Sequence, residues 1–197
     1  MNGCNKKRMN YIKNWRFDFM AIFKVINNDY PDYNSVEHLI SYVLDGTNGF
    51  TGQLYSQYIY PLNSYAIASQ MRYVSQFFGK DNRRLVRHIV IAYEDYLQEY
   101  IGVQNLLKNI WECMLMYFPQ NQWIIAPHEK DERIHVHIVY NLTNFYDGKQ
   151  INESGSFFTQ LAYGFSCHGI MVKPDKMKHI NYNVFQTVDK VVLGLLS

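Results

Sequence analysis

Two strand-like segments joined by a short polar stretch limit the folds open to this chain more than any other feature of its sequence. Residues 123–126 and 134–140 are apolar and rich in β-branched and aromatic side chains, whereas residues 128–133 between them are polar. A connection this short returns the chain alongside itself, because parallel strands need a much longer crossover. The sequence therefore predicts an antiparallel hairpin with its loop at residues 128–133.

Further strand and helix patterns flank this hairpin. Strands are expected at residues 20–26 and 86–93, where apolar and β-branched residues dominate. Helices are expected at residues 36–44, 64–78, 104–118 and 156–165. Residues 47–63 predict a long connection with a short hairpin, and Asp95 is expected to open a further helical stretch. The order β-α-α-β-α-β-β-α predicts an α+β fold, with a mainly antiparallel central sheet flanked by helices.

Composition limits the class of protein. The chain has 197 residues and a mass of 23.4 kDa, and 48% of its residues are hydrophobic, which suits one domain with an ordinary core. It contains no run of about eighteen apolar residues, which excludes a transmembrane helix and predicts no membrane insertion. Its three cysteines form no CxxC pair, which excludes a disulfide framework and predicts a cytoplasmic protein.

Positive charge is concentrated at the start of the chain. Residues 1–19 hold five basic residues against one acidic residue, although the whole chain has a formal net charge of only +2. We expect residues 1–19 to form a flexible basic arm and residues 20–197 to form the functional domain. Because the remainder is slightly acidic, any nucleic-acid site must be local rather than spread over the surface.

Three of the seven histidines fall within ten residues: His128, His135 and His137. Residues two apart on a strand face the same side, so His135 and His137 present two imidazoles side by side, and the predicted loop returns His128 beside them. Three converging imidazoles can hold a divalent cation and leave positions open to water or substrate. Ligand softness alone favours zinc, but the sequence does not choose the metal. Asp131 or Asn141 could orient a ligand from outside.

The histidines also have a purely structural interpretation. His135 and His137 could be hydrogen-bonded residues on a solvated sheet face. We favour the metal site, because a third histidine one loop away is not needed for such a face. His88, on the strand at residues 86–93, is expected to pack or to donate and accept hydrogen bonds rather than to bind metal.

A resemblance to a known family enters at these residues. Residues 128–141, followed by Gly148 and Lys149, resemble the HUH motif of plasmid relaxases, the mobilisation nucleases that nick DNA at a transfer origin. In that family a histidine and an acidic loop precede a His-hydrophobic-His strand that ends in asparagine. The resemblance extends over about residues 20–155.

Two upstream segments carry the rest of the resemblance. Residues 39–46 look like the family's helical segment with the nucleophilic tyrosine, and residues 87–93 are similar to its middle strand. Ala92 stands where the family often has serine, so a polar contact to DNA is in doubt.

The resemblance implies a metal-dependent DNA strand transferase on an HUH-type α+β fold. It implies that Tyr42 attacks the scissile phosphate and forms a 5′-phosphotyrosyl bond. His128, His135 and His137 would hold a divalent metal, with magnesium or manganese expected and zinc as a further option. Asp131 or the cation would help to remove the tyrosine proton. Single-stranded origin DNA is the implied substrate, and accessory relaxosome proteins are implied partners.

Several alternatives stay open at this level. Tyr42 follows Leu39 by three residues in the helix that Ser35 is expected to cap, so it could be a core residue instead. Without the resemblance nothing separates it from the other nearby tyrosines, which are Tyr30, Tyr33, Tyr55 and Tyr58. Arg133 and Lys149 are candidate phosphate contacts, although both are also typical of solvated turns.

Two other functions also fit the sequence. The three histidines could serve a metal-dependent hydrolase or oxygenase. The chain could instead be a C-terminally truncated, non-catalytic remnant that binds DNA without turnover.

Overall fold

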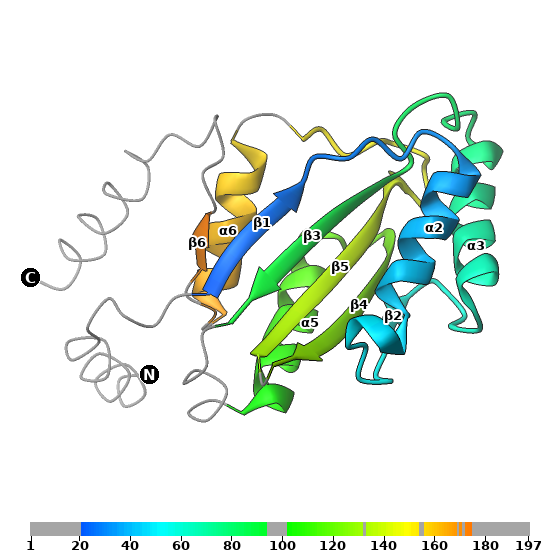
Figure 1. Ribbon diagram of the computed structural model, residues 1–197. Helices are drawn as coiled ribbons and strands as arrows, with labels where there is room; N and C mark the ends of the chain where they lie inside the picture. Colours follow the sequence, from blue (N-terminus) through cyan, green and yellow to red (C-terminus); the bar gives the residue numbers. More distant parts are fainter. Residues whose placement is uncertain are drawn as a thin grey trace, which may run out of the picture.

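A six-stranded sheet with helices on both faces organises the chain (Figure 1). The computed structural model describes residues 21–93, 102–131, 133–153, 156–168, 170 and 172–174. The strands are β1 (Ala21–Ile26), β2 (Tyr55–Gln57), β3 (Val86–Ala92), β4 (Asn121–Lys130), β5 (Arg133–Asn144) and β6 (Val172–Pro174). Their order is β2-β4-β5-β3-β1-β6, and all neighbours pair antiparallel except β1 and β6, which are parallel. The predicted α+β class with a mainly antiparallel sheet is confirmed.

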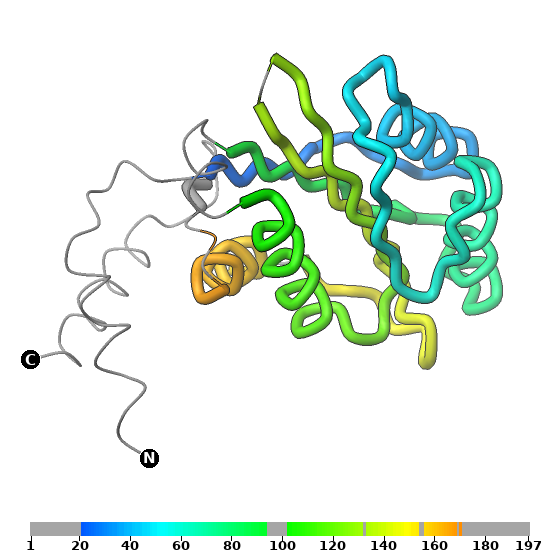
Figure 2. Tube along the Cα trace, turned by 90° about the horizontal axis from the view of Figure 1, so that it is seen from below, coloured from blue at the N-terminus to red at the C-terminus, as the bar shows by residue number. Residues whose placement is uncertain are grey.

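Helices pack on each face of this sheet. α2 (Tyr33–Val43) and α3 (Ser64–Phe77) lie on one face, and α5 (Val103–Tyr117) and α6 (Phe157–Cys167) lie on the other (Figure 2). The short 3₁₀ helix η1 (Gly46–Asn48) follows α2. Each face has its own hydrophobic core, and the core under α5 and α6 is the larger of the two.

Alternation along β5 assigns its side chains to these two cores. Val136 and Ile138 belong to the core under α5 and α6, whereas Val139 belongs to the core under α2 and α3. Because successive strand residues face opposite sides, His135 and His137 lie on the same side as Val139. The two histidines therefore face the layer that contains α2.

The predicted hairpin exists, but its strands are longer than expected. β4 continues to Lys130 and β5 begins at Arg133, and these two residues are paired. The prediction of a loop at residues 128–133 is therefore wrong. His128 lies inside the ladder, opposite His135, and Asp131 opens the tight turn with a left-handed φ of 51°. Backbone hydrogen bonds pair polar residues as well as apolar ones, so the ladder extends past the apolar run.

The helix that carries Tyr42 begins earlier than predicted. Asp32, not Ser35, is its N-cap: the Asp32 carboxylate accepts a hydrogen bond from the Ser35 backbone N–H at 2.8 Å, in a capping box. Its apolar face is as predicted, with four buried residues, Val36, Leu39, Ile40 and Val43. Downstream, β2 pairs with β4 instead of forming the short hairpin expected at residues 47–63.

Some predictions lie outside the described residues. These are the basic arm at residues 1–19 and the helical stretch that Asp95 was expected to open. Within the described ranges, no helix combines the length and the apolar character needed to cross a membrane.

A close backbone contact ties the end of α2 to β4. The Glu129 backbone N–H donates to the Gly49 carbonyl at 2.8 Å, and Phe50 forms a bridge with His128. Gly49 has a φ of +96°, and a Cβ built there would lie 2.4 Å from the Glu129 carbonyl oxygen. Only glycine satisfies both the backbone conformation and the close approach. Gly49 therefore holds the chain after α2 against the strand that carries His128.

Replacing this glycine tests the contact. Gly49→Ala combines left-handed strain with a clash against backbone, so we expect it to lower the free energy of unfolding by about 2–4 kcal/mol. Gly52→Ala is the matched control, because Gly52 also has a positive φ (+83°) but no atom within 4 Å of the added Cβ. It should cost only about 1 kcal/mol. Urea denaturation measures both, and equal losses would contradict the close contact.

Candidate functional site

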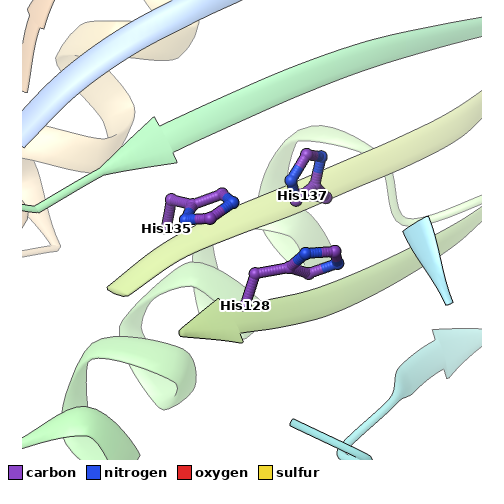
Figure 3. Close-up of side chains that lie close together, drawn as sticks. All are labelled: His128, His135 and His137. Atoms are coloured by element: carbon purple, nitrogen blue, oxygen red, sulfur yellow. The ribbon is translucent and has the colours of Figure 1, made fainter. Parts of the chain in front are cut away.

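Three histidine rings meet on the α2 side of the β4–β5 hairpin (Figure 3). The pairing of β4 with β5 sets His128 directly opposite His135, and His137 follows two residues later on the same face. One ring nitrogen from each histidine lies within 4.8 Å of the other two. The ring centroid of His137 is 4.3 Å from that of His128 and 5.0 Å from that of His135. The structure thus brings together the three residues that the sequence pattern singled out, and we refer to them as the histidine triad.

Burial keeps two of these rings neutral. Removal from water, together with charge repulsion from the neighbouring histidines His88, His128 and His135, lowers the pKa of His137 to about 2. Burial also lowers the pKa of the half-buried His135, helped by His128 and Lys130. Neutral imidazoles have a lone pair available at physiological pH, which a metal ligand requires.

The individual nitrogen atoms fit a divalent cation. Within the described part of the chain, the buried Nε2 of His137 has no hydrogen-bond partner, so it can offer its lone pair to a cation when the ring hydrogen is on Nδ1. In His128, Nε2 lies 2.6 Å from the Val43 carbonyl oxygen and Nδ1 lies 3.1 Å from that of Asn48. One of these nitrogens must leave its carbonyl to bind a cation, while the other can keep its partner and orient the ring. Two nitrogens on one cation lie at most about 4.2 Å apart, so binding would draw the rings slightly inward.

Tyr42 lies against this triad. Its ring meets that of His137 edge-on, with centroids 5.7 Å apart and planes at 78°. The side chain is 48% exposed, which excludes the alternative of a core tyrosine. Of the other tyrosines considered, Tyr33 packs on Tyr65 and Tyr58 stacks on Phe145, away from the triad.

A cleft of about 880 Å³ opens beside Tyr42 and is lined by His135 and His137. It is also lined by polar residues that the sequence analysis did not identify as site residues, among them Lys24, Ser35 and His38. The alternation of β1 carried a signal for Lys24, because this exposed residue lies between two buried neighbours. Nothing local marked the side chains from α2 as cleft residues.

The remaining predicted site residues lie apart from the triad. Asp131 and Arg133 lie at the exposed hairpin turn, and neither lines the cleft. Lys149 is exposed and forms an ion pair with Asp147 at 2.7 Å. Asp131, Arg133 and Lys149 thus all lie in or next to turns, where polar and charged side chains are common.

Asn141 was expected to orient a metal ligand, but the structure gives its amide other partners. Its Nδ2 donates to the Met71 carbonyl and to the Gln122 side chain, and its Oδ1 accepts from the Ser75 hydroxyl. Asn141 therefore joins β5 to α3 and β4. It lies four positions after His137 along an extended strand, which is too far for contact with the triad.

His88, rather than Asn141, contributes a side-chain hydrogen bond to the triad. Its Nε2 lies 2.7 Å from Nδ1 of His137, and both rings are buried. The prediction that His88 makes hydrogen bonds rather than binding metal agrees with this contact. The contact between His88 and His137 follows from the pairing of β3 with β5. Val90 lies opposite His137, and His88, two residues before Val90 on the same face, therefore lies diagonally beside His137.

The chain resembles known proteins in sequence and in fold. The family model of relaxases described as the MobA/VirD2-like nuclease domain matches residues 42–162, a range that begins at Tyr42 and contains the histidine triad. Among solved structures, the chain is similar to the MobM relaxase domain (MOBV; Mob_Pre) bound to 26-nucleotide pMV158 oriT DNA. That match has a TM-score of 0.50 and 10% identity, and covers 85% of this chain and 98% of the other. At this identity the likeness concerns the fold alone. None of the curated proteins compared with the chain matches it.

The buried histidines make the cation-free protein sensitive to acid. Burial lowers the pKa of His88 to about 4 and that of His137 to about 2, from an ordinary 6.5. The unfolded chain therefore takes up protons that the folded chain excludes, so stability present above pH 6.5 is lost as the pH falls toward 4. We expect the free energy of unfolding in chelator to drop between pH 7 and pH 5, by about 1–2 kcal/mol per histidine. Urea titrations at several pH values measure the loss, and a constant free energy over this range would contradict the neutral rings.

Proposed function

Because the chain belongs to the MobA/VirD2-like relaxase family, we propose that it nicks origin-of-transfer DNA through Tyr42 in the mobilisation of a plasmid or conjugative element. The observation that carries this proposal is the contact of the exposed Tyr42 ring with His137 of the histidine triad. A nucleophile and a candidate cation site on one open cleft are the two parts that tyrosine-based strand transfer requires.

The reaction exchanges one phosphodiester bond for another. The Tyr42 oxygen attacks the phosphorus, a new O–P bond forms, and the bond to the 3′ oxygen breaks. The products are a 5′-phosphotyrosyl protein and a free 3′-hydroxyl, which takes up one proton as the phenol loses one. The new ester retains the energy of the broken bond, so rejoining needs no external energy source.

The triad supplies the electrostatic part of this chemistry. A divalent cation held by His128, His135 and His137 would polarise the scissile phosphate when bound. Imidazole nitrogen suits zinc and other transition metals better than it suits magnesium, so the donor set does not by itself support the expected magnesium or manganese. Membership of the relaxase family supports a divalent metal in general, without identifying it.

Proton removal and DNA contacts involve further residues. Asp131 is our predicted proton acceptor, and its exposed carboxylate lies at the tip of the hairpin that carries the triad. Arg133, at the same tip, is our predicted phosphate contact. Lys149 would contact DNA farther away, beyond the opposite end of β5. Single-stranded DNA as substrate and accessory relaxosome proteins as partners belong to the same proposal.

The experiment looks for the covalent intermediate. We expect protein incubated with manganese and single-stranded oligonucleotides tiled over the DNA that flanks its gene to acquire a 3′-end label on a denaturing gel. A 5′-end label should stay with the free fragment, because the break leaves its 3′-hydroxyl unattached. Tyr42→Phe should abolish the adduct, since only the attacking oxygen is removed from an exposed side chain. Chelation should abolish it as well.

The control is Tyr33→Phe. It removes a phenol from the same helix, but this phenol packs on Tyr65 and does not lie against the triad. It should retain the adduct. Cleavage that persists in Tyr42→Phe would favour the three-histidine hydrolase, in which water is the nucleophile. DNA binding by the unaltered protein with no cleavage at all would favour the non-catalytic remnant.

A further inference from the structure

A buried contact between two histidines lies directly beneath the triad. His88 on β3 and His137 on β5 stack with their ring centroids 5.0 Å apart and their planes at 22°. His88 Nε2 and His137 Nδ1 are 2.7 Å apart, and the two residues are only 4% and 3% exposed. The sheet register sets Val139 opposite His88 and Val90 opposite His137, so the two histidines are diagonal neighbours on one face. Both rings are largely removed from water, and Nε2 of His88 and Nδ1 of His137 are each other's hydrogen-bond partners.

The hydrogen bond restricts where the protons lie. Two neutral imidazoles can share a hydrogen bond only if one offers an N–H and the other a lone pair. If His137 carries its hydrogen on Nδ1, it donates to His88, and its Nε2 becomes a lone pair. The reverse assignment places a hydrogen on Nε2 of His137. Each assignment leaves one buried N–H without an acceptor among the described residues: that of His88 Nδ1 in the first and that of His137 Nε2 in the second. Only the first assignment allows His137 to bind a cation.

We infer that His88 is a positioning residue for the metal centre: it accepts the hydrogen bond from Nδ1 of His137 and thereby aims the Nε2 lone pair of His137 at the cation. Carboxylates and backbone carbonyls commonly fill this role beside metal-bound histidines. A neutral imidazole performs it here without adding negative charge near a phosphate. His137 also contacts the Tyr42 ring, so its orientation affects both halves of the site. The inference rests on the proposed function, because it assumes that the triad binds a cation.

His88 itself is not placed to be a ligand. Its Nε2 is already engaged by His137, and the nitrogens that converge within 4.8 Å come from His128, His135 and His137. The effect of His88 must therefore pass through His137.

The test compares three substitutions of His88 by their manganese affinity, measured by isothermal titration calorimetry on the full chain. His88→Leu removes the hydrogen-bond acceptor at similar side-chain volume. We expect it to weaken manganese binding by about 10- to 100-fold, as is common when the hydrogen-bond partner of a metal-binding histidine is lost. His88→Gln and His88→Asp restore an acceptor oxygen and should bind within about threefold of the unaltered protein. His38→Leu removes an imidazole that lines the same cleft from α2, and should not change the affinity.

Each outcome separates positioning from packing. If His88→Gln and His88→Asp bind as weakly as His88→Leu, the residue acts only through packing and the inference is overturned. If His88→Leu binds as well as the unaltered protein, the inference fails while the proposed cation site stands. Absence of manganese and zinc binding in the unaltered protein overturns both.

A second measurement uses the unaltered protein and so does not depend on whether the variants fold. Nitrogen-15 NMR of the histidine rings in the cation-free protein reports which ring nitrogen carries the hydrogen. We expect the Nδ1–H form for His137. The Nε2–H form would overturn the inference.

Discussion

Backbone hydrogen bonds between β4 and β5 set His128 opposite His135, and the rest of the site depends on that register. A slip of one residue would turn every side chain of one strand to the other face of the sheet. The histidines of that strand would then point into the apolar core under α5 and α6. The same slip would expose Val136 and Ile138, both of which are fully buried. The two hydrophobic cores therefore hold the register, and the register aligns the imidazoles.

The helices α2 and α3 cover only part of their face of the sheet. The site lies where this covered part ends. Val139 and Ala126 lie in the core beneath α2 and α3, and the next residues on the same face of their strands, His137 and His128, begin the polar site. α2 lies across this boundary. One side of the helix is buried in the core, whereas Tyr42, at the edge of its apolar stripe, reaches the cleft above His137. The same helix can therefore be anchored by packing and still present an accessible phenol.

Features that repeat every few residues could be predicted from the sequence. The residue at which a helix begins and the extent to which two strands pair could not. The apolar face of α2 and the shared orientation of His135 and His137 follow from periods of 3.6 and 2 residues, which are local. The start of α2 does not follow from its sequence, because Asp32 and Ser35 can both cap a helix and the chain path before the helix decides between them. The length of the hairpin does not follow from its apolar residues, because β4 remains paired with β5 through the polar residues up to Lys130.

The sequence by itself determined the fold class, the presence of the hairpin, and which histidines share one face of a strand. Outside the hairpin itself, the tertiary structure alone decided which side chains meet across strands. His88 and His137 are 49 residues apart and touch because β3 pairs with β5 in one particular register. Asn141 shares the face of His137, yet its amide is satisfied by Met71, Ser75 and Gln122. The physical reason is that a strand's period is a property of its own backbone, whereas its neighbours and their register result from the packing of distant segments into a common core.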